Sequence, residues 1–199
     1  MNTAKPRGKF LGFEEEFVNP FRRSVRTQSI RSLLLLGALS AGATTLVAQS
    51  PRPSQHGSVT QEVAGTKITI EYNRPVARGR ELFGALIPWG RVWNPGADNA
   101  TTISVSTNVQ VNGKALPAGT YSLWAEPDPK NWTIIFSRAQ PVWHTPYPAG
   151  RDALRVTVDP RTGPHMETLA FYFPVVDGKH AELVLHWGTV VVPVQFDAP

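Results

Sequence analysis

The strongest constraint on the fold of this chain is a strand-like alternation of apolar and polar residues with a period of two. It is clearest in residues 67–72, where Ile68, Ile70 and Tyr72 fall on one face of an extended strand. Similar runs recur between turn-forming Gly, Pro and Asn residues, at 101–107, 154–158, 169–173, 183–187 and 190–196. The pattern predicts one all-β domain over residues 49–199, built as an antiparallel β-sandwich or jelly-roll-like barrel of about nine to ten strands.

Two hairpins can be placed from the sequence. Asn112-Gly113 predicts a two-residue type I′ turn, because Asn and Gly best tolerate the positive φ that both central positions need. A second two-residue turn is expected at Gly188-Thr189, since it aligns six apolar residues on one face: Leu183, Leu185, Trp187, Val190, Val192 and Val194. Pro193 has no N–H to donate, so we expect it at a sheet edge or at a bulge.

A four-residue turn is expected at residues 127–130, where two prolines flank Asp128. This turn would pair Ala125 with Trp132 and would direct Trp124 to the face opposite the core. Five apolar residues would then point inward: Tyr121, Leu123, Trp132, Ile134 and Phe136. Only residues 81–86 have the pattern of a single helical turn.

Residues 1–48 have the order of a secretory signal peptide, with a long positive region before an apolar one. The apolar stretch 33–48 has 16 residues, fewer than the roughly 20 that span a bilayer as a helix, so we expect no stable membrane anchor. Cleavage is expected after Ala48, with Ala-Gly-Ala at 41–43 as the alternative. The mature protein is then periplasmic or secreted, by the general route or, given Arg22-Arg23, by the twin-arginine route.

The charge and cysteine content exclude several function classes. Of the 20 Lys/Arg and 15 Asp/Glu residues, 7 and 3 lie in residues 1–48, which leaves 13 and 12, a net charge of +1, in 49–199. The folded part therefore lacks the basic footprint of a nucleic-acid-binding protein. The chain has no cysteine, which excludes disulfides, thiolate metal sites and a cysteine nucleophile.

Several motifs occur in an order and spacing that resembles an exported bacterial family catalogued as domain of unknown function 2911. They lie at residues 78–84, 88–93, 96–102, 111–123 and 132–135, and the resemblance extends over residues 51–197. It implies export and one mostly β domain, and it offers no catalytic residue to transfer. This chain departs from the family pattern at Asn94-Pro95, where Arg is common, and at Asp98, where Asn is common.

The best candidate for a ligand site is the 26-residue stretch from Arg74 to Asn99, which has little strand character. Its arginines suit carboxylate, phosphate or sulfate, and its tryptophans could stack on a sugar or an aromatic ring. The candidate ligand-binding residues are Arg74, Arg78, Arg80, Trp89, Arg91, Trp93, Asn94, Asp98 and Asn99, with His144 from a second irregular segment, 138–152. The alternative interpretation is structural: the segment closes one end of the sandwich, and its tryptophans plug the core.

The sequence favours a non-catalytic exported domain that binds a glycan or a small anionic ligand. A hydrolase that uses Asp98, Glu81 or His144 is the alternative, and a protein-interaction module that pairs through a sheet edge is a third hypothesis. The five histidines show no metal-binding spacing, because His180 and His186 would lie about 20 Å apart along one strand. No metal or other cofactor is therefore expected, and the oligomeric state is left open.

Overall fold

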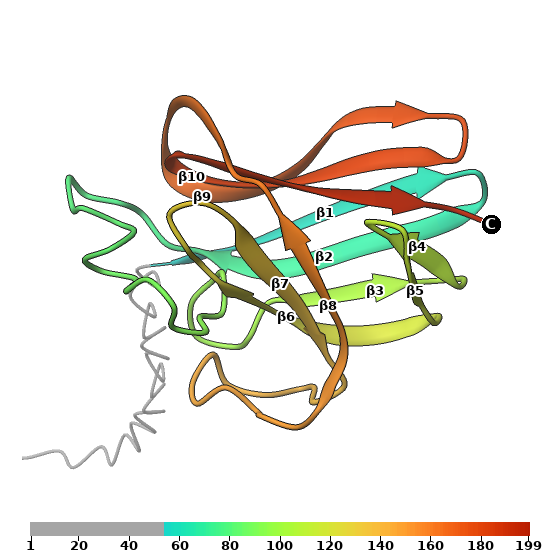
Figure 1. Ribbon diagram of the computed structural model, residues 1–199, viewed down its shortest axis with the longest axis horizontal. Helices are drawn as coiled ribbons and strands as arrows, with labels where there is room; N and C mark the ends of the chain where they lie inside the picture. The colour runs from blue at the N-terminus through green and yellow to red at the C-terminus, as the bar shows by residue number, and fades with distance from the viewer. Residues whose placement is uncertain (1–53) are drawn as a thin grey trace, which may run out of the picture. The chain divides into compact units, whose positions relative to one another are not determined.

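The computed structural model describes residues 54–199, which form ten β-strands in two antiparallel sheets (Figure 1). The six-stranded sheet has the order β1 (Gln55–Val63), β2 (Thr66–Arg74), β3 (Thr102–Val105), β6 (Gly119–Glu126), β7 (Trp132–Ser137) and β8 (Asp152–Val158). The four-stranded sheet has the order β5 (Lys114–Leu116), β4 (Val109–Val111), β10 (His180–Asp197) and β9 (Arg161–Asp177). The predicted all-β sandwich is confirmed, and the predicted signal peptide, residues 1–48, lies outside the described residues.

The inner faces of the two sheets form the core. Ile68, Ile70 and Tyr72 on β2 are buried there, as the alternation predicts. Burial of one such side chain stabilises the fold by about 1.5–3 kcal/mol. The strand β1 packs beside β9 and β5 packs beside β8, so the sheets approach each other at both edges.

The hairpin between β4 and β5 turns at Asn112-Gly113, as predicted. The φ angles are 47° at Asn112 and 73° at Gly113, and Val111 pairs with Lys114 on either side. Both angles lie in the left-handed region that a type I′ turn requires. The side-chain oxygen of Asn112 also accepts the backbone N–H of Gln195, which joins this hairpin to β10.

The predicted turn at Gly188-Thr189 is wrong, because both residues lie inside the continuous strand β10. Gly188 has a φ of 59°, and the pairing with β9 shifts on both sides of it, so it forms a bulge. The hairpin turns instead at Gly178-Lys179, and Asp177 pairs with His180. The expected edge position of Pro193 is wrong, because β10 lies between β4 and β9. Pro193 falls instead in the stretch between the part of β10 paired with β9, as far as Val191, and the part paired with β4, from Phe196.

The predicted pairing of β6 with β7 is wrong by two residues. Ala125 pairs with Ile134, and Leu123 pairs with Phe136. The connecting loop is thus longer than the predicted turn at 127–130. A shift of two residues keeps each side chain on its face, so the five predicted inward residues are all buried in the core and Trp124 points to the other face.

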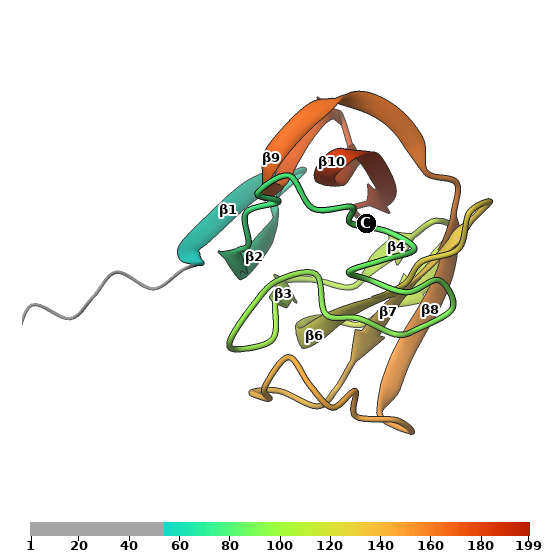
Figure 2. The ribbon, with the colours of Figure 1, turned by 90° about the vertical axis from the view of Figure 1, so that its left-hand side faces the viewer.

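Two irregular segments flank the sandwich, and Figure 2 shows both from the end of the molecule. The long loop, residues 75–101, connects β2 to β3 and crosses this end. The lip, residues 138–151, connects β7 to β8 and lies over the outer face of the six-stranded sheet. The predicted helical turn at 81–86 is wrong. Leu86 N–H donates to Glu81 O and Ile87 N–H donates to Leu82 O. Each bond reaches back five residues, whereas the bonds of an α-helix reach back four.

Candidate functional site

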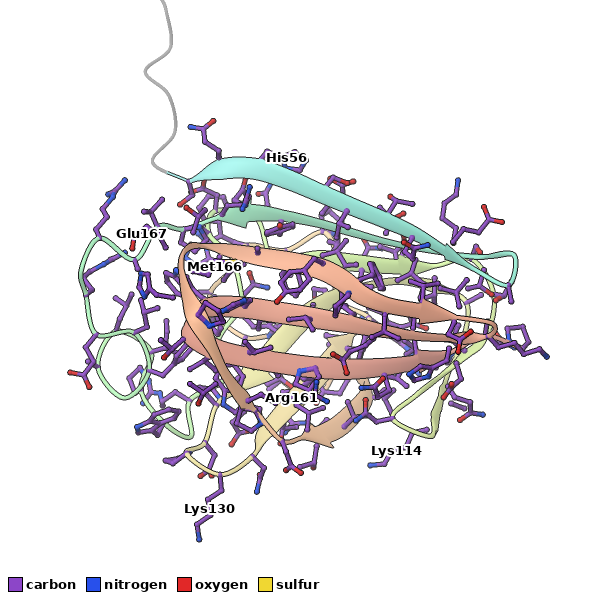
Figure 3. The ribbon with its side chains drawn as sticks, turned by 90° about the horizontal axis from the view of Figure 1, so that it is seen from above. His56, Lys114, Lys130, Arg161, Met166 and Glu167 are labelled. Carbon is purple, nitrogen blue, oxygen red and sulfur yellow. The ribbon has the colours of Figure 1, made fainter. Side chains whose placement is uncertain are left out.

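The start of the long loop is tied to β9 by backbone hydrogen bonds. Ala77 N–H donates to Glu167 O at 2.8 Å, and Leu169 N–H donates to Pro75 O at 3.0 Å. The Arg74 Nε–H donates to Leu169 O at 3.1 Å, so this predicted ligand residue holds the same junction. Figure 3 shows Glu167 beside the loop, at the end of the molecule opposite Lys114.

The carboxylate of Glu167 organises this junction. It lies 2.9 Å from His165 Nε2 and accepts the backbone N–H of Arg78 at 2.6 Å. The hydrogen bond from His165 and the one from Arg78 hold the pKa of Glu167 below its usual value. Arg78 itself has a φ of 54°, and this predicted ligand residue contributes a backbone N–H to the junction.

Arg80 lines an open groove of about 300 Å³ at this end of the sandwich, here called the end groove. Its guanidinium donates from Nε to Ala77 O at 2.8 Å and from Nη2 to Val76 O at 2.6 Å. Side chains from the loop, β9 and β10 complete the groove, chiefly Glu81, Phe83, Trp89, His165 and Trp187. Two predicted residues, Arg80 and Trp89, thus share one groove.

Aromatic rings fill the end of the core behind the end groove. Trp93 stacks on Trp187 with ring centroids 6.0 Å apart and an interplanar angle of 16°. Phe83 contacts both rings and also Trp89, which is 41% exposed. Trp93 therefore packs within the aromatic cluster that closes this end of the core, and Trp89 stays accessible to a ligand.

Asn94 is a structural residue, because it is fully buried and both ends of its amide are bonded. Its Nδ2 donates to Leu123 O at 2.7 Å, and its Oδ1 accepts Thr101 N–H at 3.1 Å. These bonds join the long loop to β6. Arg91 is exposed on the same loop and lines neither groove described here.

The last three predicted residues lie where the long loop pairs with the lip. His144 N–H donates to Asp98 O at 3.0 Å, and the imidazole Nδ1 also lies 2.6 Å from that carbonyl oxygen. Asn99 and Trp143 form an isolated antiparallel bridge beside it. The sequence does not predict this pairing, which is what brings the two irregular segments together.

A second and larger groove, here called the sheet groove, lies on the outer face of β1, β2 and β3 next to the lip. Its volume is about 690 Å³. Of the predicted residues it includes only Asn99, and the other main lining residues are His56, Glu71, Asn73, Thr102 and Trp143. Sequence reasoning missed this site, although the outward positions 71 and 73 of β2 carry polar side chains that would mark an accessible face.

Trp124 is buried beneath the lip, in a small apolar cluster with Ala100 and Ile135. Tyr147 covers it edge-on, with ring centroids 5.3 Å apart. Burial, and next the hydrogen bond to the Asp152 carboxylate, raise the pKa of Tyr147. Trp124 therefore anchors the lip and does not face a ligand.

The acid and base groups of the hydrolase hypothesis do not share a groove. Glu81 lines the end groove, whereas His144 and Asp98 lie at the contact between the lip and the long loop. Within residues 54–199, no three His, Asp or Glu side chains gather as metal ligands. No helix in this part of the chain is long and apolar enough to cross a membrane.

Residues 54–196 match the family DUF2911, which is described as a protein of unknown function. The match extends from the start of β1 to Phe196 near the end of β10 and includes both grooves. Comparison with curated proteins and with solved structures gave no match. The predicted family relationship is confirmed: this chain belongs to the DUF2911 family.

Proposed function

We propose that this protein is a non-catalytic binding domain that acts outside the cytoplasm and holds a small anionic ligand in the end groove. The observation that carries the proposal is the position of Arg80, whose guanidinium lines a groove that also contains accessible aromatic surface. An arginine that is already fixed in place loses little conformational entropy when it binds a carboxylate.

The remaining donors of Arg80 suit an anion. A guanidinium has five N–H groups, and two of them are used by Ala77 O and Val76 O. The other three can bind a carboxylate, sulfate or phosphate oxygen. Trp89 and Phe83 offer apolar faces to the rest of the ligand, such as the ring of an acidic sugar.

Glu81 limits both the affinity for an anionic ligand and the number of negative charges that the ligand can carry. It lines the same groove and opposes the charge of Arg80. Only a ligand whose anionic group reaches Arg80 while staying away from Glu81 would gain affinity. This arrangement favours a small ligand with one localised negative group over a densely charged polymer.

Two further observations support the remaining parts of the proposal. The separation of Glu81 from His144 and Asp98 supports binding without catalysis, since acid–base chemistry requires groups within reach of one substrate. The signal-like order of residues 1–48 supports a location in the periplasm or outside the cell.

The test is isothermal titration calorimetry at low salt with citrate, sulfate and galacturonate as probes. Arg80→Ala should weaken binding roughly tenfold or more, because a charge-assisted hydrogen bond is lost. Glu81→Gln should tighten it, and this variant leaves the bonds of Arg80 to the backbone intact. The control is Arg91→Ala, in the same loop and outside the groove.

Arg80→Ala and Glu81→Gln should change the affinity in opposite directions, and this pair separates a ligand site from a structural role. If the anion bound outside the end groove and Arg80 acted only by stabilising the loop, Glu81→Gln would leave the affinity unchanged. Binding of none of the three probes, or an equal loss in the Arg80 and Arg91 variants, would overturn the proposal.

A further inference from the structure

We propose that the sheet groove is a separate binding site for a neutral oligosaccharide chain. This inference goes beyond the proposed anion site, since it concerns another face of the molecule and other residues. The groove is the larger of the two, and its volume of about 690 Å³ lies within the range of about 300–1,000 Å³ typical of ligand sites.

The wall of the sheet groove carries an indole that the core does not use. Trp143 is 51% exposed, the largest exposure among the large apolar side chains of residues 54–199. Its neighbour Val142 packs on the small cluster around Trp124, which already anchors the lip. Trp143 therefore presents exposed aromatic surface in the groove that can pack against a ligand.

The backbone holds Trp143 in position although its side chain is exposed. Ala100 N–H donates to Val142 O at 3.0 Å, and His144 N–H donates to Asp98 O at 3.0 Å, on either side of it. The imidazole of His144 contacts the indole, with ring centroids 5.2 Å apart. A ligand that stacks on Trp143 would thus meet a largely preorganised surface.

The floor of the groove is polar and follows the pairing of three strands. His56 on β1 pairs with Asn73 on β2, and Glu71 on β2 pairs with Thr102 on β3. Figure 3 shows His56 on β1, the outermost strand of its sheet. Asn73 is buried and its Nδ2 already donates to Ala97 O at 2.9 Å, so the floor offers a ligand chiefly the Thr102 hydroxyl, the Glu71 carboxylate and the His56 imidazole.

Glu71 has a fixed orientation in this floor. Its Oε2 lies 2.8 Å from His56 Nε2, and its Oε1 accepts the Ser58 hydroxyl at 2.6 Å. Each carboxylate oxygen retains a second lone pair, so Glu71 can accept a further hydrogen bond from a ligand hydroxyl. The negative charge of the carboxylate disfavours an anionic ligand, and its remaining lone pairs suit the hydroxyl donors of an uncharged one.

An apolar ring face beside several fixed hydrogen-bonding groups matches the chemistry of a sugar. The C–H groups on one face of a pyranose pack against an indole, whose π face is negative, while the equatorial hydroxyls bond to amides and carboxylates. The groove is open to solvent rather than enclosed, and its volume leaves room for more than one sugar ring. A neutral oligosaccharide is therefore the ligand class that the groove fits.

The groove favours binding over cleavage. Glycoside hydrolysis usually needs two carboxyl groups about 5–10 Å apart. Among the described residues that line the sheet groove, Glu71 is the only acid. We therefore expect the oligosaccharide to be held and not hydrolysed.

The test uses soluble hexasaccharides of β-1,4-glucose, α-1,4-glucose and β-1,4-N-acetylglucosamine, with binding followed by calorimetry. At least one should bind with a Kd of about 1 mM or tighter. Trp143→Ala should then weaken binding roughly tenfold, because the stacking surface is lost, while the melting temperature changes little. Glu71→Gln should weaken it as well, since an ionised acceptor becomes neutral.

Matched controls keep the test specific. Trp89→Ala removes the other exposed indole, and Glu62→Gln removes an exposed acid of β1 outside the groove. Both should leave the hexasaccharide Kd unchanged, and Trp143→Ala should leave anion binding at Arg80 unchanged. The two binding proposals can therefore be refuted independently of each other. The proposal is overturned if none of the hexasaccharides binds, if Trp143→Ala has no effect, or if shorter products accumulate.

Discussion

The Glu167 carboxylate accepts the backbone N–H of Arg78 at 2.6 Å, and this bond joins β9 to a loop residue 89 positions earlier in the chain. The side chain of Glu167 thus extends the contact that β9 already makes with the loop through the neighbouring Ala77 N–H. Glu167 O also accepts Ala77 N–H and the indole N–H of Trp187. One residue of β9 thus positions the loop that carries Arg80.

This junction should make the stability of the loop depend on pH. The pKa of Glu167 is lowered in the folded protein, first by the hydrogen bond from His165 and then by that from Arg78 N–H. The ionised carboxylate therefore contributes to folding stability above its unfolded pKa, and this contribution is lost as the pH falls through the folded pKa. Thermal unfolding followed from about pH 6 to pH 3 should show a loss of stability in acid that is smaller in Glu167→Gln. Glu62→Gln serves as the control, and an equal acid loss in both variants would contradict this role.

Asn94 and Asn99 should respond in opposite ways to truncation, although the sequence offers both as ligand residues. Asn94→Ala leaves Leu123 O and Thr101 N without their buried partner, which should cost about 2–4 kcal/mol. Asn99 is exposed, and Asn99→Ala should stay within about 0.5 kcal/mol of the parent. Urea unfolding measures both differences, and a loss for Asn94→Ala as small as that for Asn99→Ala would show that the amide of Asn94 is not structural.

The sequence predicts the faces of the strands better than their connections, and β10 shows why. A two-residue turn and a one-residue bulge both move the inward side chains from odd to even positions. The buried residues Leu183, Leu185 and Trp187 before Gly188, and Val192 and Val194 after it, therefore fit either structure. Only the pairing of β9 with β10, a long-range contact, decides between them.

The candidate site was predictable only in part, for a similar reason. Length and composition mark the long loop, and the structure places Arg80 and Trp89 of that loop in one groove. The sheet groove depends on the bridge between Asn99 and Trp143, which local sequence does not encode. The same is true of the cross-strand pair of His56 and Asn73, because β1 and β2 carry no signal that sets which polar pair faces the lip.

The bulge at Gly188 provides a test of the β10 geometry. Gly188→Ala forces a side chain into the left-handed region and places its Cβ 2.9 Å from Leu82 Cδ1. Gly113 has a similar φ of 73° but no atom within 4 Å of such a Cβ, so Gly113→Ala should cost only the backbone term, about 1 kcal/mol. Gly188→Ala should cost more than this in urea unfolding. A smaller loss than in the Gly113 variant would argue against the bulge.

Export of the full chain should depend on residues 1–48. Expressed in a Gram-negative bacterium, the full chain should appear outside the cytoplasm with an N-terminus at Gln49, whereas residues 49–199 alone should stay inside. Arg22→Lys with Arg23→Lys tests the route: unchanged export indicates general secretion, and loss of export indicates the twin-arginine route. Leu35→Arg interrupts the apolar run and should block either route, because translocation needs that run to be uncharged. N-terminal sequencing and cell fractionation provide the measurement, and an uncleaved chain retained in the cytoplasm would refute the proposed location.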